Sequence, residues 1–274
     1  MGALSILNNI SALEAQNSLG MTQNSLNSTL QALSTGQRIN SGADDAAGLA
    51  IANGLEANVS ALTQSVQNAT DGVGMLQVAD GALSQVTTLL NRAVTLATEA
   101  SNGTVSSSQD TALNSEYQSI LTEIGNIAGN TTYNGQAVFS ANTLTIFMSD
   151  SSSTGTTQVA ATLTALTAAA LTLTGTKLDN AADAATALTA INTAIAAVAL
   201  ERGNLGAVSN QLSAATNVMN NQITNLTSAE SGIMDANMGV ETANLSKYSI
   251  LQQTGIAALQ QSNQMQQSIL KLLQ

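Results

Sequence analysis

The chain has 274 residues, a formal net charge of −11, and no histidine, cysteine or proline. These absences exclude a disulfide framework, a thiolate metal site, a cysteine nucleophile and a catalytic histidine. Six Lys and Arg residues stand against 17 Asp and Glu residues, so nucleic acid, whose phosphates need basic side chains, is not an expected partner. Charged residues make up 8% of the chain and aromatic residues 2%, a composition that favours long aliphatic helices in a structural or assembly protein.

The N-terminal segment is expected to be helical and to need a partner. Residues 1–10 have no basic region and no unbroken apolar core, which argues against a secretory signal. Glu14 is the only charge in residues 1–37, and an isolated helix of this composition is marginal in water. Apolar residues at helical spacing mark its buried stripe: Ile6, Ile10, Leu13, Leu19, Leu26 and Leu33.

A period of seven follows and predicts a long helix. The main row consists of Leu55, Leu62, Ala69, Leu76, Leu83, Leu90 and Ala97. A second row of valines lies three or four residues away and is interrupted at Asp80 and Thr87. A seam of about six heptads is typical of a coiled coil and would run roughly 70 Å.

The middle of the chain has a different pattern. A shorter amphipathic helix is expected through residues 113–127. Asn134-Gly135 then predicts a hairpin turn, and alternation over residues 143–148 predicts a strand. Residues 149–176 are about half Ser and Thr, which indicates either a loop or weakly ordered β-structure.

The C-terminal half repeats the helical pattern. Asn180 or Asp183 is expected to cap a second long helix, whose partial second row is interrupted at Arg202. Its main row consists of Ile191, Val198, Leu205, Leu212, Met219, Leu226 and Ile233. The last segment carries a similar stripe: Leu251, Ala258, Met265, Ile269 and Leu272.

Two long helices of matching length can bury each other's stripes, and the two end helices can do the same. The predicted fold is therefore mainly α, a long antiparallel coiled-coil helical bundle with a small β-hairpin and with the chain termini paired as helices.

Four motifs identify a family. They occur in order at both ends of the chain, as LSTGQRINSGADDAAGLAIA (33–52), LGAVSN and NLTSAES (within 205–231), ILQQTG (250–255) and SILKLL (268–273). With these motifs the chain resembles bacterial flagellin over residues 1–149 and 181–274.

The resemblance implies a structural, non-enzymatic subunit without cofactors, which polymerises into the secreted, extracellular flagellar filament used for motility. Residues 1–45 with 236–274 would form the terminal coiled-coil domain at the filament core. Residues 46–149 with 180–235 would form a helical core domain with a β-hairpin near 131–149. The remaining Ser/Thr/Ala-rich segment, 150–179, would replace the large outer domains of many flagellins. Members of the family often carry O-linked glycans on exposed Ser and Thr, so residues 149–157 are either glycan acceptors or a bare flexible loop.

The assembly contacts are expected on the stripes of the chain ends and where these ends join the core: Ile6, Ile10, Leu13, Leu26, Leu33, Arg38, Asp44, Asp45, Leu251, Met265, Ile269 and Leu272. Asp44 and Asp45 have two interpretations. Either they lie in the first turn of a helix and favour its dipole, or they contact Arg38 or Arg92 of another subunit.

The resemblance also implies a contact with a vertebrate Toll-like receptor through Arg92, Leu96 and Glu116. Val94 and Thr95 stand where similar flagellins often have an Arg and a Glu, which would weaken that contact. The alternative is that Arg92 and Glu116 form an ion pair between subunits or within a helix.

Further partners implied by the resemblance are the flagellar cap and hook-junction proteins, an export chaperone and the flagellar export apparatus. A membrane is not expected, because the most apolar stretch, 159–174, is shorter than a span of about 20 residues. One alternative function is a hook–filament junction protein, which shares the terminal motifs. Another is an amphipathic helical protein that binds lipid or polymer surfaces, which the scarcity of Lys and Arg disfavours.

Overall fold

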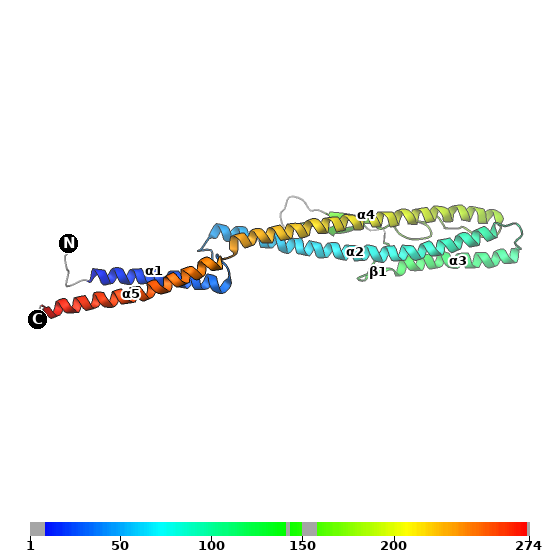
Figure 1. The fold of residues 1–274 in the computed structure, drawn as a ribbon. Helices are drawn as coiled ribbons and strands as arrows, with labels where there is room; N and C mark the ends of the chain where they lie inside the picture. The colour runs from blue at the N-terminus through cyan, green and yellow to red at the C-terminus, as the bar shows by residue number, and fades with distance from the viewer. Residues whose placement is uncertain (1–8, 141–142, 150–157, 273–274) are drawn as a thin grey trace. The chain divides into compact units, whose positions relative to one another are not determined.

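Long helices and two small pairs of strands make up the described part of the chain (Figure 1). The computed structural model describes residues 9–140, 143–149 and 158–272, with side chains up to residue 268. The chain divides into two compact units, a chain-end unit, Met1–Ala57 with Asn225–Gln274, and a central unit, Asn58–Thr224. The division falls inside two helices, whereas the sequence-based boundaries at 45/46 and 235/236 fall where helices begin and end.

The chain-end unit contains the two end helices, α1 (Ile10–Thr35) and α5 (Met238–Leu272), which lie antiparallel. Asn9 caps α1, because its side-chain oxygen accepts a hydrogen bond from the Ala12 N–H. The same oxygen accepts a hydrogen bond from the Ser262 hydroxyl of α5 at 3.1 Å. Further along the pair, Gln252 Nε2 donates to Gln23 Oε1 at 2.7 Å. The predicted pairing of the chain termini as helices is confirmed.

The two linkers that enter and leave these helices are tied to each other within the chain-end unit. Gly36 ends α1 with a φ of 75°, a left-handed conformation that glycine adopts at little cost. Beyond it, the Arg38 N–H donates to the Met234 carbonyl at 2.6 Å, and the Ala236 N–H donates to the Gly36 carbonyl at 2.9 Å. The two linkers therefore form a short antiparallel bridge of backbone hydrogen bonds.

The central unit packs most of α2 (Ala46–Ala100) and α4 (Ala181–Met234) with α3 (Ser107–Asn130). Asn180 caps α4 by accepting from two backbone N–H groups. The heptad rows lie in the core of this unit, as predicted, and their buried members are Leu62, Ala69, Leu76, Leu83, Leu90, Ala97, Ile191, Val198, Leu205, Leu212 and Met219. Periodicity thus identified the buried face of both long helices.

The strands differ from the single hairpin expected near 131–149. The Asn134-Gly135 turn joins β1 (Thr132–Tyr133) to β2 (Gln136–Ala137), with φ values of 49° and 77°. The strand expected at 143–148 is β3 (Thr143–Phe147), and it pairs instead with β4 (Gln158–Thr162). Ile146 on β3 and Val159 on β4 are opposite each other and both buried, so the second pairing covers apolar side chains on one face.

The Ser/Thr-rich segment after β4 also contributes to the core. Its leucines are buried: Leu163, Leu166, Leu171, Leu173 and Leu178. Of the stretch proposed to carry glycans, residues 150–157 lie outside the described residues.

One described helix, α4, is apolar and long enough by composition to span a bilayer, with a mean hydropathy of 1.5 over 18 residues. A core helix of a soluble protein passes the same test, and one row of α4 forms part of the core of the central unit. Hydropathy alone is therefore weak evidence for a membrane helix here.

Candidate functional site

The paired end helices expose a large part of their apolar side chains. Ile10, Leu13, Leu251 and Met265, four of the predicted assembly residues, are between 43% and 67% exposed. Leu26 is buried in the helix pair, and Leu33 is half-buried. Ile6 and the side chains of Ile269 and Leu272 lie outside the described residues.

Other apolar residues of α1 and α5 extend this exposed surface: Met21, Leu30, Met238, Val240, Ile250 and Ile256. Glu14 is the only charged residue of α1, and Glu241, Lys247 and Lys271 are the only ones of α5. Burying apolar surface gains about 25 cal/mol per Å², so a helix pair with this surface and so few charges is suited to packing against another protein.

The linker between α1 and α2 holds the polar assembly candidates. Arg38 Nη2 donates to the Ile233 carbonyl at 2.8 Å. The Asp44 carboxylate accepts hydrogen bonds from the Asn40 N–H at 3.1 Å and from the Ser41 N–H at 2.8 Å. These bonds, with one from the Ser41 hydroxyl, favour the ionised form and lower the pKa of Asp44.

Asp44 and Asp45 precede α2 instead of lying in its first turn. Asp45 accepts from the Gly48 N–H at 2.9 Å, so it caps the helix. Among the described residues, neither carboxylate forms an ion pair with an arginine of its own chain. Gly48 and Ile39 pack closely in this linker, a contact that the sequence analysis did not predict. A Cβ on Gly48 would lie 2.8 Å from Ile39 Cδ1, and Ile39 is 2% exposed. The sequence signal for this close contact is a glycine in the first helical turn after an acidic cap.

The predicted receptor residues do not share one surface. Arg92 Nε on α2 lies 2.7 Å from Glu116 Oε1 on α3, and both side chains are about half exposed. This hydrogen-bonded pair lowers the pKa of Glu116 and raises that of Arg92. The pair joins two helices of one chain, which corrects the expectation of a pair within a helix or between subunits. Leu96 is 0% exposed, so the expectation that it offers a contact surface disagrees with its place in the core.

The described residues contain no group of three or more Asp or Glu side chains placed to hold a metal ion. The most prominent features of the described residues are the exposed helix pair, its linkers and the helical core. This combination is typical of structural proteins that associate through helices.

Comparisons with known proteins identify this class more closely. Residues 6–143 match the bacterial flagellin N-terminal helical region, and residues 188–273 match the bacterial flagellin C-terminal helical region. The chain belongs to the bacterial flagellin family. It is similar to the flagellin of Halalkalibacterium halodurans, with 34% identity over 98% of this chain and 99% of that protein.

Two solved structures are also similar. The crystal structure of Bacillus cereus flagellin has 32% identity and a TM-score of 0.50, and the match covers 60% of this chain and 94% of that one. A putative flagellar hook-associated protein from Vibrio parahaemolyticus has a TM-score of 0.58 and covers 70% of this chain and all of that one. At 16% identity, this second likeness shows the fold alone. The protein is a filament subunit for flagellar motility, and flagellins are structural proteins that polymerise with themselves.

Proposed function

We propose that the exposed apolar faces of α1 and α5 are the surfaces through which copies of this chain pack in the filament. The observation that carries the proposal is the exposure of ten large apolar side chains on two helices that have almost no charge. In a monomer these side chains face water, at a cost that packing against a second copy would remove. Few ions would have to be desolvated when such faces are buried.

The contacts are heterologous in this proposal, with one patch on each copy meeting a different patch on the next. A heterologous contact that does not close generates an open helical polymer. Residues 1–45 with 236–274 would form the inner part of the filament, and residues 46–149 with 180–235 the part around it. The segment 150–179 would be a remnant in place of outer domains.

Arg38, Asp44 and Asp45 would act at the edge of this contact. Their backbone hydrogen bonds fix the linker, and their exposed charged atoms can meet a neighbouring copy. Outside the filament, the partners implied by the family resemblance are an export chaperone, the flagellar export apparatus, the cap and the hook-junction proteins. Recognition by a Toll-like receptor would rest on Arg92 and Glu116, which are accessible in the monomer. The filament itself would be secreted and extracellular.

The test compares two substitutions on the same face region of α5. Ile250 is 63% exposed, and Ile250→Ser should raise the protein concentration needed for polymerisation, measured by sedimentation and electron microscopy. Gln253→Ser, an exposed polar position of the same helix, is the matched control and should polymerise normally. Equal behaviour of the two variants would contradict the proposal.

A truncation gives a stronger test. Deleting residues 236–274 should abolish polymerisation and leave the central unit folded by circular dichroism, because that unit has its own core. Polymers formed by this truncated chain would show that α5 is dispensable. Electron microscopy of the intact protein also separates the two flagellar roles, since a filament subunit forms long polymers and a junction protein stays monomeric.

A further inference from the structure

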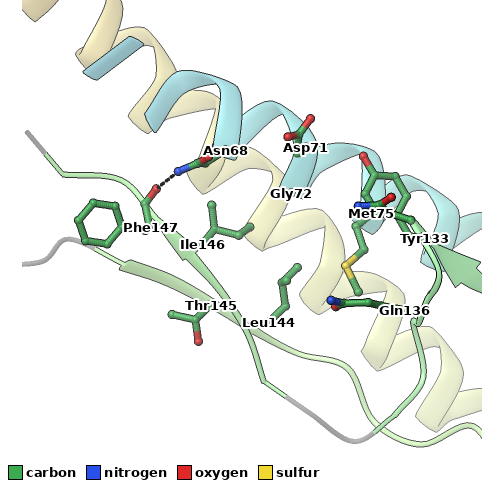
Figure 2. A pocket seen from close by; sticks show the side chains of 11 residues that line it. Asn68, Asp71, Gly72, Met75, Tyr133, Gln136, Leu144, Thr145, Ile146 and Phe147 are labelled. Atoms are coloured by element: carbon green, nitrogen blue, oxygen red, sulfur yellow. Dashed lines mark hydrogen bonds between the residues drawn. The ribbon is translucent and has the colours of Figure 1, made fainter. Parts of the chain in front are cut away.

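A pocket of about 620 Å³ lies in the central unit between α2, the β1–β2 hairpin and β3 (Figure 2). Asp71 and Met75 of α2 line one side, and Leu144 of β3 lines the other. Tyr133 and Phe147 also line the pocket, so it gathers two of the five aromatic residues of the chain. Phe147 is 43% exposed, so part of its ring is accessible at the pocket.

The pocket exists because glycines let β-structure approach α2 closely. A Cβ on Gly72 would overlap the side chain of Ile146, and a Cβ on Gly74 would lie 3.1 Å from the Tyr133 hydroxyl. Ile146 is buried against α2, and Asn68 Nδ2 donates to the Phe147 carbonyl at 3.3 Å, which fixes the end of β3 beside the helix. The elements that line the pocket are therefore packed directly against each other.

Asp71 supplies the negative charge of this pocket. Its carboxylate accepts one hydrogen bond, from Gln67 Nε2 at 3.2 Å, and no cation pairs with it among the described residues. If a neighbouring copy covers the pocket, this carboxylate loses water and needs a positive partner, because an unpaired buried charge is very costly. A carboxylate beside aromatic rings and a thioether is suited to a guanidinium group, which can form paired hydrogen bonds and stack on a ring.

Few basic residues can supply that charge. Arg92, Lys177 and Arg202 are already paired with carboxylates of their own chain. Lys247 lies 5.5 Å from the ring centre of Tyr248, and the side chain of Lys271 lies outside the described residues. Arg38 uses Nη2 for a backbone carbonyl and has no carboxylate partner among the described residues, so its other N–H groups remain for a second copy.

We propose that this pocket is the seat for the Arg38 guanidinium of a second copy of the chain. The inference rests on the proposed function, that is, on polymerisation, and it assigns one contact of the polymer to Asp71 and the surrounding aromatic side chains. It is consistent with the linker arginine having no carboxylate partner among the described residues, in a chain with six basic residues.

A double-mutant cycle tests the pairing. Asp71→Asn and Arg38→Gln should each raise the critical concentration for polymerisation by at least about thirtyfold, as expected when one partner of a desolvated charge pair is removed. The double variant should be no worse than the poorer single variant, because the same contact is lost once. Additive effects of the two substitutions would overturn the proposal.

Glu123→Gln is the matched control for Asp71→Asn. Glu123 is an exposed helical carboxylate that also accepts only a hydrogen bond from a side-chain amide of its own helix, Asn126, at 3.2 Å. It lies outside the pocket, and its substitution should leave the critical concentration unchanged. An equal effect at Glu123 would mean that net charge matters and the pocket does not.

The absence of cysteine from the chain allows a second test by cross-linking. Asp71→Cys and Arg38→Cys chains are mixed, polymerised and treated with a short bis-maleimide, and the cross-linked dimers are mapped by mass spectrometry. The proposal expects a 71–38 dimer that is absent when Glu123→Cys replaces Asp71→Cys. Polymers without this dimer overturn the pairing but leave the proposed function intact, whereas polymers from chains lacking 236–274 would overturn the proposed function itself.

Discussion

Asp80 and Arg202, which each interrupt an apolar row of a long helix, are partners across the central unit. Arg202 Nε lies 2.7 Å from Asp80 Oδ1, and Nη2 lies 3.3 Å from Oδ2, so the guanidinium and the carboxylate meet at two points. The pair raises the pKa of Arg202 through its hydrogen bond to Asp80. Two breaks in the heptad pattern thus form one interhelical contact that fixes the register of α2 against α4.

Removing the Asp80–Arg202 ion pair should lower the free energy of unfolding only slightly. Because the two side chains are 46% and 38% exposed, Asp80→Asn is expected to lower the free energy of unfolding by at most about 1 kcal/mol. Urea denaturation of the monomer measures this loss, and combination with Arg202→Gln gives the coupling energy. A loss above about 3 kcal/mol would indicate a pair that behaves as fully buried.

The pair of Arg92 with Glu116 should make the central unit sensitive to acid. Since the folded-state pKa of Glu116 is lowered, the pair contributes stability above the unfolded value of 4.5, and this contribution is lost as the pH falls through the folded value. Melting temperatures measured from neutral pH down to below 4.5 should therefore fall less in Glu116→Gln than in the unmodified protein. Parallel curves for the two proteins would contradict the assignment.

Tyr117 should give the opposite dependence at alkaline pH. Burial raises its pKa above 10.0 and outweighs the hydrogen bond to Thr176, so the contribution of the neutral phenol is present below that value and is lost as the pH rises further. Tyr117→Phe should remove this alkaline loss and cost about 1 kcal/mol at neutral pH through the missing hydrogen bond. Thermal melts at neutral and alkaline pH measure both effects.

Gly48→Ala should disturb the linker between α1 and α2. The added Cβ would lie 2.5 Å from Asp45 Oδ2 and 2.8 Å from Ile39 Cδ1, so we expect a destabilisation of about 1–3 kcal/mol and faster hydrogen exchange at residues 38–48. Gly54→Ala is the control on the same helix, because a Cβ there meets nothing within 4 Å. It should instead stabilise α2 by up to about 1 kcal/mol. Identical exchange in the two variants would contradict the steric argument.

Periodicity predicted the helices and their buried rows, but it did not predict how wide the buried face becomes. Around Leu96, α2 also buries Ala93, Ala97 and Ala100. The contact of Arg92 with Glu116 shows that α3 packs against this stretch of α2. A heptad row describes packing against one neighbouring helix. It therefore predicted that Leu90 and Ala97 are buried, but it did not include Leu96, which was expected to be exposed.

The pairing of β3 was harder to predict for a different reason. A strand's own alternation fixes which side chains share a face, but its partner depends on distant residues. Val159 and Ala161 lie in a segment dominated by Ser, Thr and Ala, where the apolar signal is weak.

The sequence predicts that apolar residues of the end helices take part in assembly, since helices with so little charge need partners. Which of them face each other within the chain, as Leu26 does, depends on the angular position of α5 around α1.

The backbone bridge between the two linkers has a mechanical consequence. The Arg38 N–H donates to the last residue of α4, the Ala236 N–H donates to Gly36, and the Arg38 side chain adds a third bond to the Ile233 carbonyl. A pulling force on the α1–α2 linker is therefore also carried by the α4–α5 linker. To separate the two linkers, all three hydrogen bonds must break at the same time. In a rotating filament, two linkers joined in this way would resist twisting better than two independent segments. Most side-chain substitutions would leave this resistance intact, because backbone groups supply two of the three hydrogen bonds.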